Sequence, residues 1–183
     1  TLPLATDGVQ DPAVGMDAPG LVGANFDGTP VSVTPGDGKP YMLVFLAHWC
    51  PHCNAELPRL VEWYEDGSVP EGLEVVGIAT GTDAKLQNYP PSEWIVDKDW
   101  PAEWPVMADS VESMSFVVSG GSGFPYLMIV GADGTLVLLD HAPLARAQEE
   151  GQTIRGKSGP LFVRTGREFR PARKTTSLRR TLL

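Results

Sequence analysis

YMLVFLAHWCPHCNAELPRLVEWY, residues 41–64, joins a continuous apolar run to a pattern with helical spacing. Residues 41–47 are apolar at every position, which is typical of a central strand buried on both faces. One apolar face then recurs at helical intervals, at Leu57, Leu60, Val61 and Tyr64. Pro51 suits a first helical turn because its missing N–H would have no partner there. We predict a strand followed directly by a helix, which Pro58 is expected to kink.

The flanking sequence extends this pair into an α/β fold. A second buried run at residues 72–80 follows the helix, and strand, helix and strand in this order predict a parallel pair. Residues 21–33 surround Asp27-Gly28 and predict a hairpin, as do the runs 125–130 and 135–140. Parallel and antiparallel pairs together predict a central mixed sheet flanked by helices.

The middle of the chain is less regular. Residues 82–104 are interrupted by prolines and are interpreted as an insertion with one short helix. A short strand is expected within residues 104–109, and a helix within 110–120 that Ser110 caps. A final helix is expected at residues 143–150. The domain assignment is an extended lead-in at 1–13, one domain at 14–150 and a basic tail at 151–183.

Length and charge limit the classes of function. The chain has 183 residues, and its longest apolar run is far too short to cross a bilayer, which needs about 20 apolar residues. Of its 23 Asp and Glu residues, 20 precede residue 142, whereas ten of the 14 Lys and Arg residues follow residue 141. Phosphate binding requires clustered basic residues, so the acidic body argues against a nucleic-acid partner. We expect the basic tail to be a solvated extension.

Both cysteines lie at the predicted junction of strand and helix. Cys50 falls at the helix N-terminus, where unpaired N–H groups and the helix dipole stabilise a thiolate. Thiolates are the nucleophiles of disulfide exchange, and Cys53, one turn further, is placed to attack a mixed disulfide. His52 lies between them and can donate to the Cys50 sulfur, or it is simply exposed on the first turn.

A metal site is the main alternative for this cluster. Zinc usually takes four ligands, so a zinc site would have to recruit His48 and His52, or the distant His141. Cu(I) prefers soft thiolate ligands, so Cys50 and Cys53 could instead bind copper. A copper-binding module is therefore the alternative function. We expect no metal and no cofactor.

The motif HWCPHC after a strand, with a helix containing Pro58 and the segment GFPYLMIV, resembles the thioredoxin superfamily. Within it, the hairpin at 21–33, the run CPHCNAELP and the insertion are most similar to the ResA/TlpA type of thiol-disulfide oxidoreductase, over roughly residues 14–141. The resemblance implies a cis peptide bond at Phe124-Pro125, on a loop opposite the cysteines. It also implies that Trp49, Phe124 and Pro125 contact the substrate.

The resemblance further implies a mechanism. Cys50 attacks, Cys53 resolves, His52 tunes the reduction potential, and Glu56 exchanges protons with Cys53. An ordinary surface ion pair with Arg59 is the alternative for Glu56. The expected partners are cysteine-containing proteins and a redox partner protein. We expect a monomer outside the cytoplasm, in the periplasm or cell envelope, from which an N-terminal signal or membrane tether has been removed.

Some residues depart from the family pattern. The dipeptide Pro51-His52 resembles that of the oxidant DsbA, whereas the scaffold resembles reductants, so the direction of electron transfer stays open. Phe124 is larger than the usual residue before the proline, which affects the expected partner groove. A peroxiredoxin would place Thr or Ser three residues before its reactive cysteine and Pro seven before, where this chain has Ala47 and Leu43.

Overall fold

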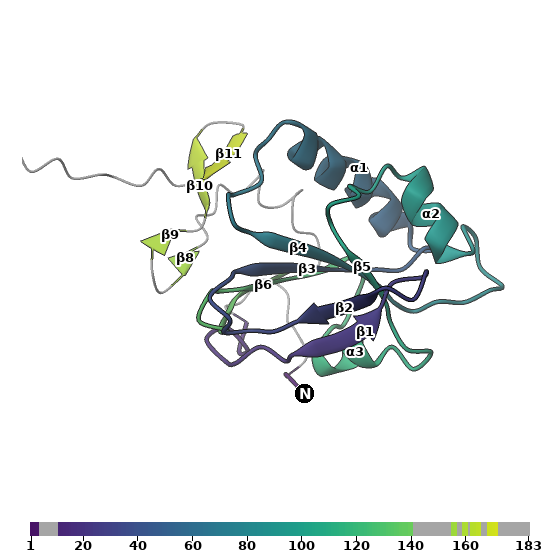
Figure 1. Cartoon of the computed structure of the whole chain (residues 1–183), viewed down its shortest axis with the longest axis horizontal. Coiled ribbons are helices and arrows are strands. Elements are labelled where there is room, and N and C mark those ends of the chain that lie inside the picture. The colour runs from purple at the N-terminus through teal and green to yellow at the C-terminus, as the bar shows by residue number, and fades with distance from the viewer. Residues whose placement is uncertain (4–10, 141–154, 157–158, 161, 166–167, 172–183) are drawn as a thin grey trace, which may run out of the picture.

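A seven-stranded mixed sheet of order β2-β1-β5-β4-β3-β6-β7 forms the centre of the molecule (Figure 1). The computed structural model describes residues 1–3, 11–140, 155–156, 159–160, 162–165 and 168–171. The strands of the sheet are β1 (Leu21–Ala24), β2 (Pro30–Val33), β3 (Tyr41–Leu46), β4 (Glu74–Ala79), β5 (Val106–Ala108), β6 (Tyr126–Val130) and β7 (Leu136–Asp140). Two further pairs follow in the chain, β8 (Arg155–Gly156) with β9 (Gly159–Pro160) and β10 (Phe162–Thr165) with β11 (Glu168–Pro171).

Strand β3 lies inside the sheet, as its apolar run predicts. All six of its residues are buried. It pairs in parallel with β4 and antiparallel with β6, while β4 pairs in parallel with β5. The predicted α/β class with a mixed sheet is therefore confirmed, and so are the two hairpins, β1 with β2 and β6 with β7.

Helices cover both faces of this sheet. Helices α1 (Pro51–Glu65) and α2 (Pro91–Asp97) lie on one face, and α3 (Met114–Val118) lies on the other (Figure 1). Leu57, Leu60 and Trp63 of α1 pack into the core cluster of the first face. Phe45 and Tyr126 belong to the cluster of the second face. Each such side chain contributes roughly 1.5–3 kcal/mol by burial.

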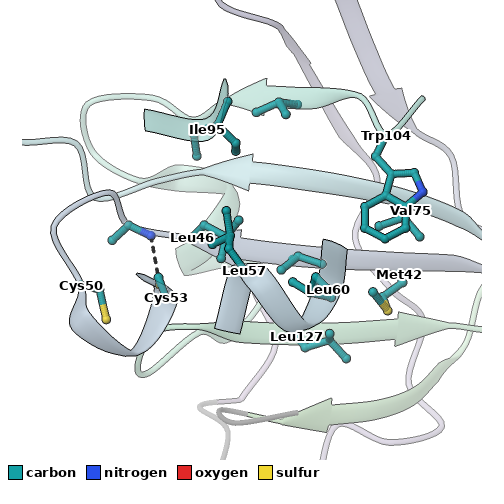
Figure 2. Packing of buried hydrophobic residues seen from close by; sticks show 14 of the residues in the cluster. Met42, Leu46, Cys50, Cys53, Leu57, Leu60, Val75, Ile95, Trp104 and Leu127 are labelled. Atoms are coloured by element: carbon teal, nitrogen blue, oxygen red, sulfur yellow. Dashed lines mark hydrogen bonds between the residues drawn. The ribbon is translucent and has the colours of Figure 1, made fainter. Parts of the chain in front are cut away.

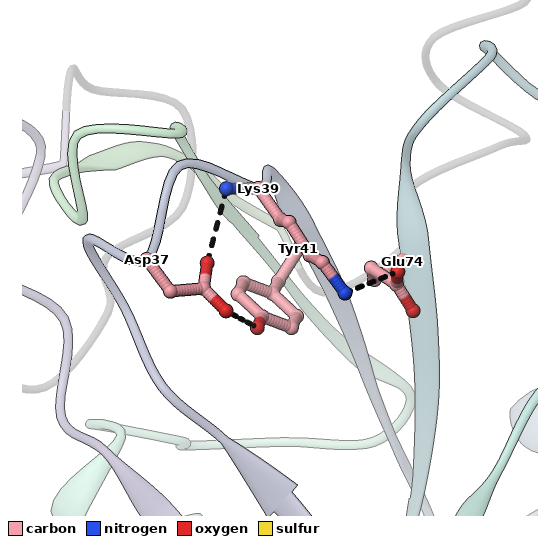
Figure 3. A network of polar contacts seen from close by, with 4 residues as sticks. All are labelled: Asp37, Lys39, Tyr41 and Glu74. Carbon is pink, nitrogen blue, oxygen red and sulfur yellow. Dashed lines mark hydrogen bonds and ion pairs between the residues drawn. The ribbon is translucent and has the colours of Figure 1, made fainter.

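Polar contacts connect the N-terminal ends of β3 and β4 (Figure 3). The Tyr41 hydroxyl donates to Asp37 Oδ2 at 2.6 Å, and the Lys39 backbone N–H donates to Asp37 Oδ1 at 3.0 Å. Lys39 Nζ forms an ion pair with Glu74 Oε1 at 3.1 Å. Because this pair is exposed, its contribution to stability is small. It joins Glu74, the partner of Tyr41 in the parallel register, to Lys39, which precedes β3.

Helix α3 is shorter than the sequence predicts. It begins after Ser113, whose φ of 54° is not that of a right-handed helix, and Val111, within the predicted helix, lies before it and is 93% exposed. The Ser110 hydroxyl accepts from the Met114 N–H at 3.1 Å, but the carboxylate of Asp109 accepts from two N–H groups at the helix start, those of Ser115 and Phe116. Tertiary placement of Asp109 after β5 therefore decides where this helix begins.

The two ends of the domain are described only in part. Leu2 and Ala13, in the predicted lead-in, are buried in the second core cluster, and the Leu2 N–H donates to Val118 O at 3.0 Å. The predicted helix at 143–150 and His141 lie outside the described residues. No helix in the described part of the chain has the length and apolar character that a bilayer span requires.

Candidate active site

Cys50 occupies the start of helix α1, as the sequence predicts. It is the N-cap residue, with φ −74° and ψ 122°, and Pro51 follows as the first helical residue. Its N–H donates to Ala47 O at 3.0 Å, and its carbonyl accepts from the Asn54 N–H at 3.1 Å. The residue is buried but keeps 5% of its surface exposed, in contrast to Cys53 at 0%. No side chain caps the helix at this position, and the first N–H groups of a helix have no partner within the helix.

Cys53 lies one turn further along α1 and faces the core (Figure 2). It is 0% exposed, and its sulfur accepts from the Ala47 N–H at 3.5 Å. Burial is the main cause that raises the pKa of the Cys53 thiol; the hydrogen bond from the Ala47 N–H opposes it, and the neighbouring Cys50 and Glu56 raise the pKa further. Both cysteines are free thiols. The site thus pairs a sulfur at the molecular edge with a protonated thiol inside.

The loop before β6 lies against Cys50. The Cys50 thiol contacts the carbonyl oxygen of Phe124 at 3.6 Å, although the two residues are 74 positions apart in the chain. The Phe124-Pro125 peptide bond is cis. Pro125 is buried directly before β6, which pairs with β3 from Phe45 opposite Tyr126. Neighbouring strands therefore bring this loop to the end of β3 where Cys50 follows.

Aromatic side chains border the same loop. The half-buried Trp49 donates from Nε1 to Gly81 O at 2.7 Å. Its ring packs edge-on against Phe124, with centroids 5.9 Å apart and planes at 87°. Phe124 packs in turn on Phe116 of α3, at 4.6 Å between centroids. The three residues predicted to contact the substrate, Trp49, Phe124 and Pro125, thus lie together around Cys50.

Glu56 lies one turn beyond Cys53 on the same face of α1. It is 3% exposed, and its Oε2 forms an ion pair with Arg59 Nη1 at 3.1 Å. The pair with Arg59 that the sequence offered as an alternative is therefore present, but the carboxylate is buried and not on the surface. A carboxylate inside the protein beside a buried thiol can accept and return a proton. His52 is exposed on the first turn of α1, so its influence on the pair stays a prediction.

His48 is a polar residue of this region whose surroundings the sequence does not predict. It is buried, and both of its ring nitrogens have backbone partners in the insertion, Gln87 O at 2.7 Å from Nδ1 and the Asp83 N–H at 3.2 Å from Nε2. These partners lie 39 and 35 positions away, and no local pattern relates them to His48. With both nitrogens engaged, His48 has no lone pair free for a metal. The described residues contain no group of three or more His, Cys, Asp or Glu side chains that could hold a metal ion.

Comparisons with known proteins agree with this geometry. A model of the AhpC/TSA family matches residues 14–137. The thiol-disulfide oxidoreductase ResA of Bacillus cereus is 25% identical over 125 residues, which cover 68% of this chain and 67% of that protein. The soluble secreted antigen MPT53 of Mycobacterium tuberculosis is 41% identical over 63 residues, 34% of this chain, so the match spans about a third (32%) of that relative. A thiol:disulfide interchange protein of the thioredoxin family from Chlorobium tepidum superposes with a TM-score of 0.53 at 28% identity, over 69% of this chain and 85% of that one.

Proposed function

The chain belongs to the AhpC/TSA family, and from this premise and the geometry around Cys50 we propose that it is a thiol-disulfide oxidoreductase acting on partner proteins. The observation that carries the proposal is the position of the Cys50 sulfur, at the N-terminus of α1 and 3.6 Å from Phe124 O, with Cys53 buried one turn behind it. This arrangement separates an attacking sulfur from a resolving one.

The exchange proceeds through a mixed disulfide. In the reducing direction the Cys50 thiolate attacks a partner disulfide, a new S–S bond forms, and the partner's second sulfur leaves as a thiolate. Cys53 then loses its proton and attacks the Cys50 sulfur of the mixed disulfide. The partner leaves with both cysteines reduced, and the two electrons it gained come from the pair Cys50 and Cys53, which is now a disulfide. The oxidising direction is the same sequence reversed.

Glu56 has a role in the second step. Because burial raises the pKa of Cys53, its thiol does not ionise readily at neutral pH. The buried carboxylate of Glu56, one turn away, accepts the Cys53 proton as the sulfur attacks and returns it in the reverse direction. His52, exposed beside the pair, stabilises negative charge on Cys50 when its ring is protonated and so favours the dithiol form.

The partner binds in an extended conformation across the loop before β6. Pro125 lacks an N–H and leaves the neighbouring backbone groups to pair with a substrate strand next to Cys50. Trp49 and Phe124 supply apolar surface for the residues that flank the partner's cysteine. Expected partners are a cysteine-containing substrate and a second redox protein that restores the pair. The secreted relative MPT53 supports a location outside the cytoplasm.

Insulin reduction with dithiothreitol as electron source tests the proposal. We expect the wild-type protein to accelerate precipitation of the insulin B chain and Cys50→Ser to lose this activity entirely. Cys53→Ser should trap the mixed disulfide, visible as a covalent adduct by mass spectrometry. Full activity in Cys50→Ser would refute the mechanism. Stoichiometric Cu(I) binding to a wild-type protein without exchange activity would instead favour the copper-binding alternative.

The direction of transfer follows from the reduction potential of the pair. Equilibration of the protein with glutathione buffers measures this potential directly. A value near that of thioredoxin, about −270 mV, assigns a reductant, and one near that of DsbA, about −120 mV, assigns an oxidant.

A further inference from the structure

The loop that carries Cys50 is tied to the insertion through His48. The Asp83 backbone N–H points at His48 Nε2, at 3.2 Å, and His48 Nδ1 lies 2.7 Å from Gln87 O. A backbone N–H can only donate and a carbonyl can only accept. Nε2 must therefore carry the lone pair and Nδ1 the proton. The two bonds together specify one tautomer of a neutral imidazole.

The main chain around His48 is held by the same segment. The His48 carbonyl accepts from Asn88 Nδ2 at 2.9 Å, and the Trp49 carbonyl accepts from Gln87 Nε2 at 3.0 Å. With the two ring contacts, four hydrogen bonds connect residues 83–88 with the two residues that precede Cys50. Residues 83–88 contain no helix or strand of their own, so these bonds fix their position on the domain.

A second set of bonds continues from this loop into the helices. Asn54 Nδ2 of α1 donates to Cys50 O at 2.9 Å and contacts His48 O at 3.3 Å. Its Oδ1 accepts from Trp94 Nε1 of α2 at 3.0 Å. The carbonyls of residues 48, 49 and 50 thus all accept side-chain donors, and the insertion contributes to this network from both its loop and its helix.

We propose that His48 is a positioning residue for the exchange reaction. Its neutral ring binds residues 83–88 to the loop that carries Cys50. This contact holds Cys50 at the separation from Cys53 at which the disulfide closes. This inference rests on the proposed function. His48 touches neither the partner nor a reacting sulfur. His48 changes the effective concentration of the Cys50 thiol near the Cys53 thiol. This concentration depends on how rigidly the backbone around Cys50 is held.

Three substitutions at one position separate the two bonds. His48→Leu removes both. His48→Asn places an amide N–H near the position that Nδ1 has in His48, and so keeps a donor for Gln87 O. His48→Gln places an amide oxygen near the position of Nε2, and so keeps an acceptor for the Asp83 N–H. Val33→Ala, in β2 and the opposite core cluster, is the control that destabilises the protein without touching this loop.

The decisive readout is the equilibrium constant between the Cys50–Cys53 disulfide and glutathione. We expect His48→Leu to lower the constant for disulfide closure on the order of tenfold, because a looser loop lowers the effective concentration of the thiols. His48→Asn and His48→Gln should fall between His48→Leu and wild type, and Val33→Ala should match wild type. Amide hydrogen exchange should show faster deuteration at Asp83 in His48→Leu and His48→Asn, but not in His48→Gln.

Two results would overturn the proposal. One is a glutathione equilibrium of His48→Leu within twofold of wild type. The other is a glutathione equilibrium constant of Val33→Ala that shifts as much as that of a His48 variant with the same melting temperature. Such a result would show that the constant depends on general stability and not on His48. If His48→Leu does not fold, the same comparison is made with His48→Asn and His48→Gln. Absence of any disulfide exchange in the wild-type protein would refute the proposed function itself and is recognised before a variant is compared.

Discussion

The two cysteines differ in environment although only two residues separate them. Cys50 sits outside the first helical turn, where helix N–H groups lack partners, while Cys53 is enclosed by the core and by the Ala47 N–H. Desolvation disfavours the thiolate of Cys53, whose pKa is raised. The residue spacing of the motif therefore produces two thiols with different chemical roles.

Selective alkylation tests this difference. In the reduced protein near neutral pH, we expect iodoacetamide to modify Cys50 at least roughly 100-fold faster than Cys53, because the thiolate is the reactive form and burial suppresses it at Cys53. Peptide mass spectrometry after timed quenching measures both rates. In guanidinium chloride the two rates should converge. Equal rates in the folded protein would contradict the unequal environments.

The buried Glu56 leads to a second prediction for single residues. Glu56→Gln should slow release of the partner from the mixed disulfide by about tenfold or more, since general-base catalysis contributes roughly 100-fold or more where it operates. The loss should shrink as pH rises, because hydroxide then removes the Cys53 proton. Stopped-flow tryptophan fluorescence, to which Trp49 beside Cys50 contributes, measures this step.

The matched control for Glu56 is on the same helix. Glu62 is exposed on α1, and Glu62→Gln changes the same charge without a change near Cys53. We expect its release rate to equal that of the wild type. Similar losses in both variants would assign the effect of Glu56→Gln to net charge or helix stability and not to proton transfer.

At the scale of elements, the insertion is packed closely against the sheet. A Cβ at Gly77, in β4, would lie 2.9 Å from Cζ2 of Trp100 in the insertion. The Trp100 ring is held by its Nε1, which donates to Trp104 O at 2.9 Å, and by edge contact with the Trp104 ring. The glycine thus permits the insertion to approach the strand that precedes it.

Replacing this glycine tests the packing. Gly77→Ala should lower the free energy of unfolding by about 1–3 kcal/mol, as is usual when a methyl group is added to a filled core. Urea denaturation measures the change. Gly20→Ala is the control, because the nearest atom to its Cβ would be Val33 O at an ordinary 3.5 Å, and it should be close to neutral. A neutral Gly77→Ala would show that Trp100 moves freely.

At the scale of the whole molecule, the sheet separates two hydrophobic core clusters. Each cluster contains a buried ionisable side chain, so the free energy of unfolding depends on pH. Cys53 belongs to the cluster under α1, and Tyr126 to the cluster under α3. Burial raises the pKa of both side chains, and burial with the bond to Asp37 raises the pKa of Tyr41 to about 12. In each case the native state keeps a proton that the unfolded chain releases.

The free energy of unfolding of the reduced protein should therefore fall at alkaline pH. Above about pH 8.5 the unfolded chain releases the Cys53 proton while the native state retains it, so the unfolded state binds fewer protons and stability decreases with pH. From about pH 10 to pH 12, Tyr41 adds to the decrease. Chemical denaturation across this range measures the slope. Cys53→Ala should flatten the part between pH 8.5 and 10, and an unchanged slope would contradict the assignment.

Local patterns predicted the elements that carry the cysteines. The apolar run of β3 and the spacing of Leu57 and Leu60 after Pro51 are properties of neighbouring residues, and so is the turn at Gly28, where φ is 86°. The short α3 was overestimated because Asp109, which accepts from its first N–H groups, belongs to the preceding β5 loop. The roles of Glu56 and His52 remain predictions from the family resemblance.

By itself the sequence determined the parallel strand–helix–strand unit and the place of Cys50 before a helix, because these depend on hydrophobic periodicity and on the steric properties of proline. Tertiary structure alone decided that Phe124 O meets the Cys50 sulfur, that the carboxylate of Glu56 is buried, and that His48 binds Asp83 and Gln87. Residue spacing sets which side chains share a face of one element. The meeting of residues 35 to 74 positions apart depends on how complete elements pack, which no local pattern encodes.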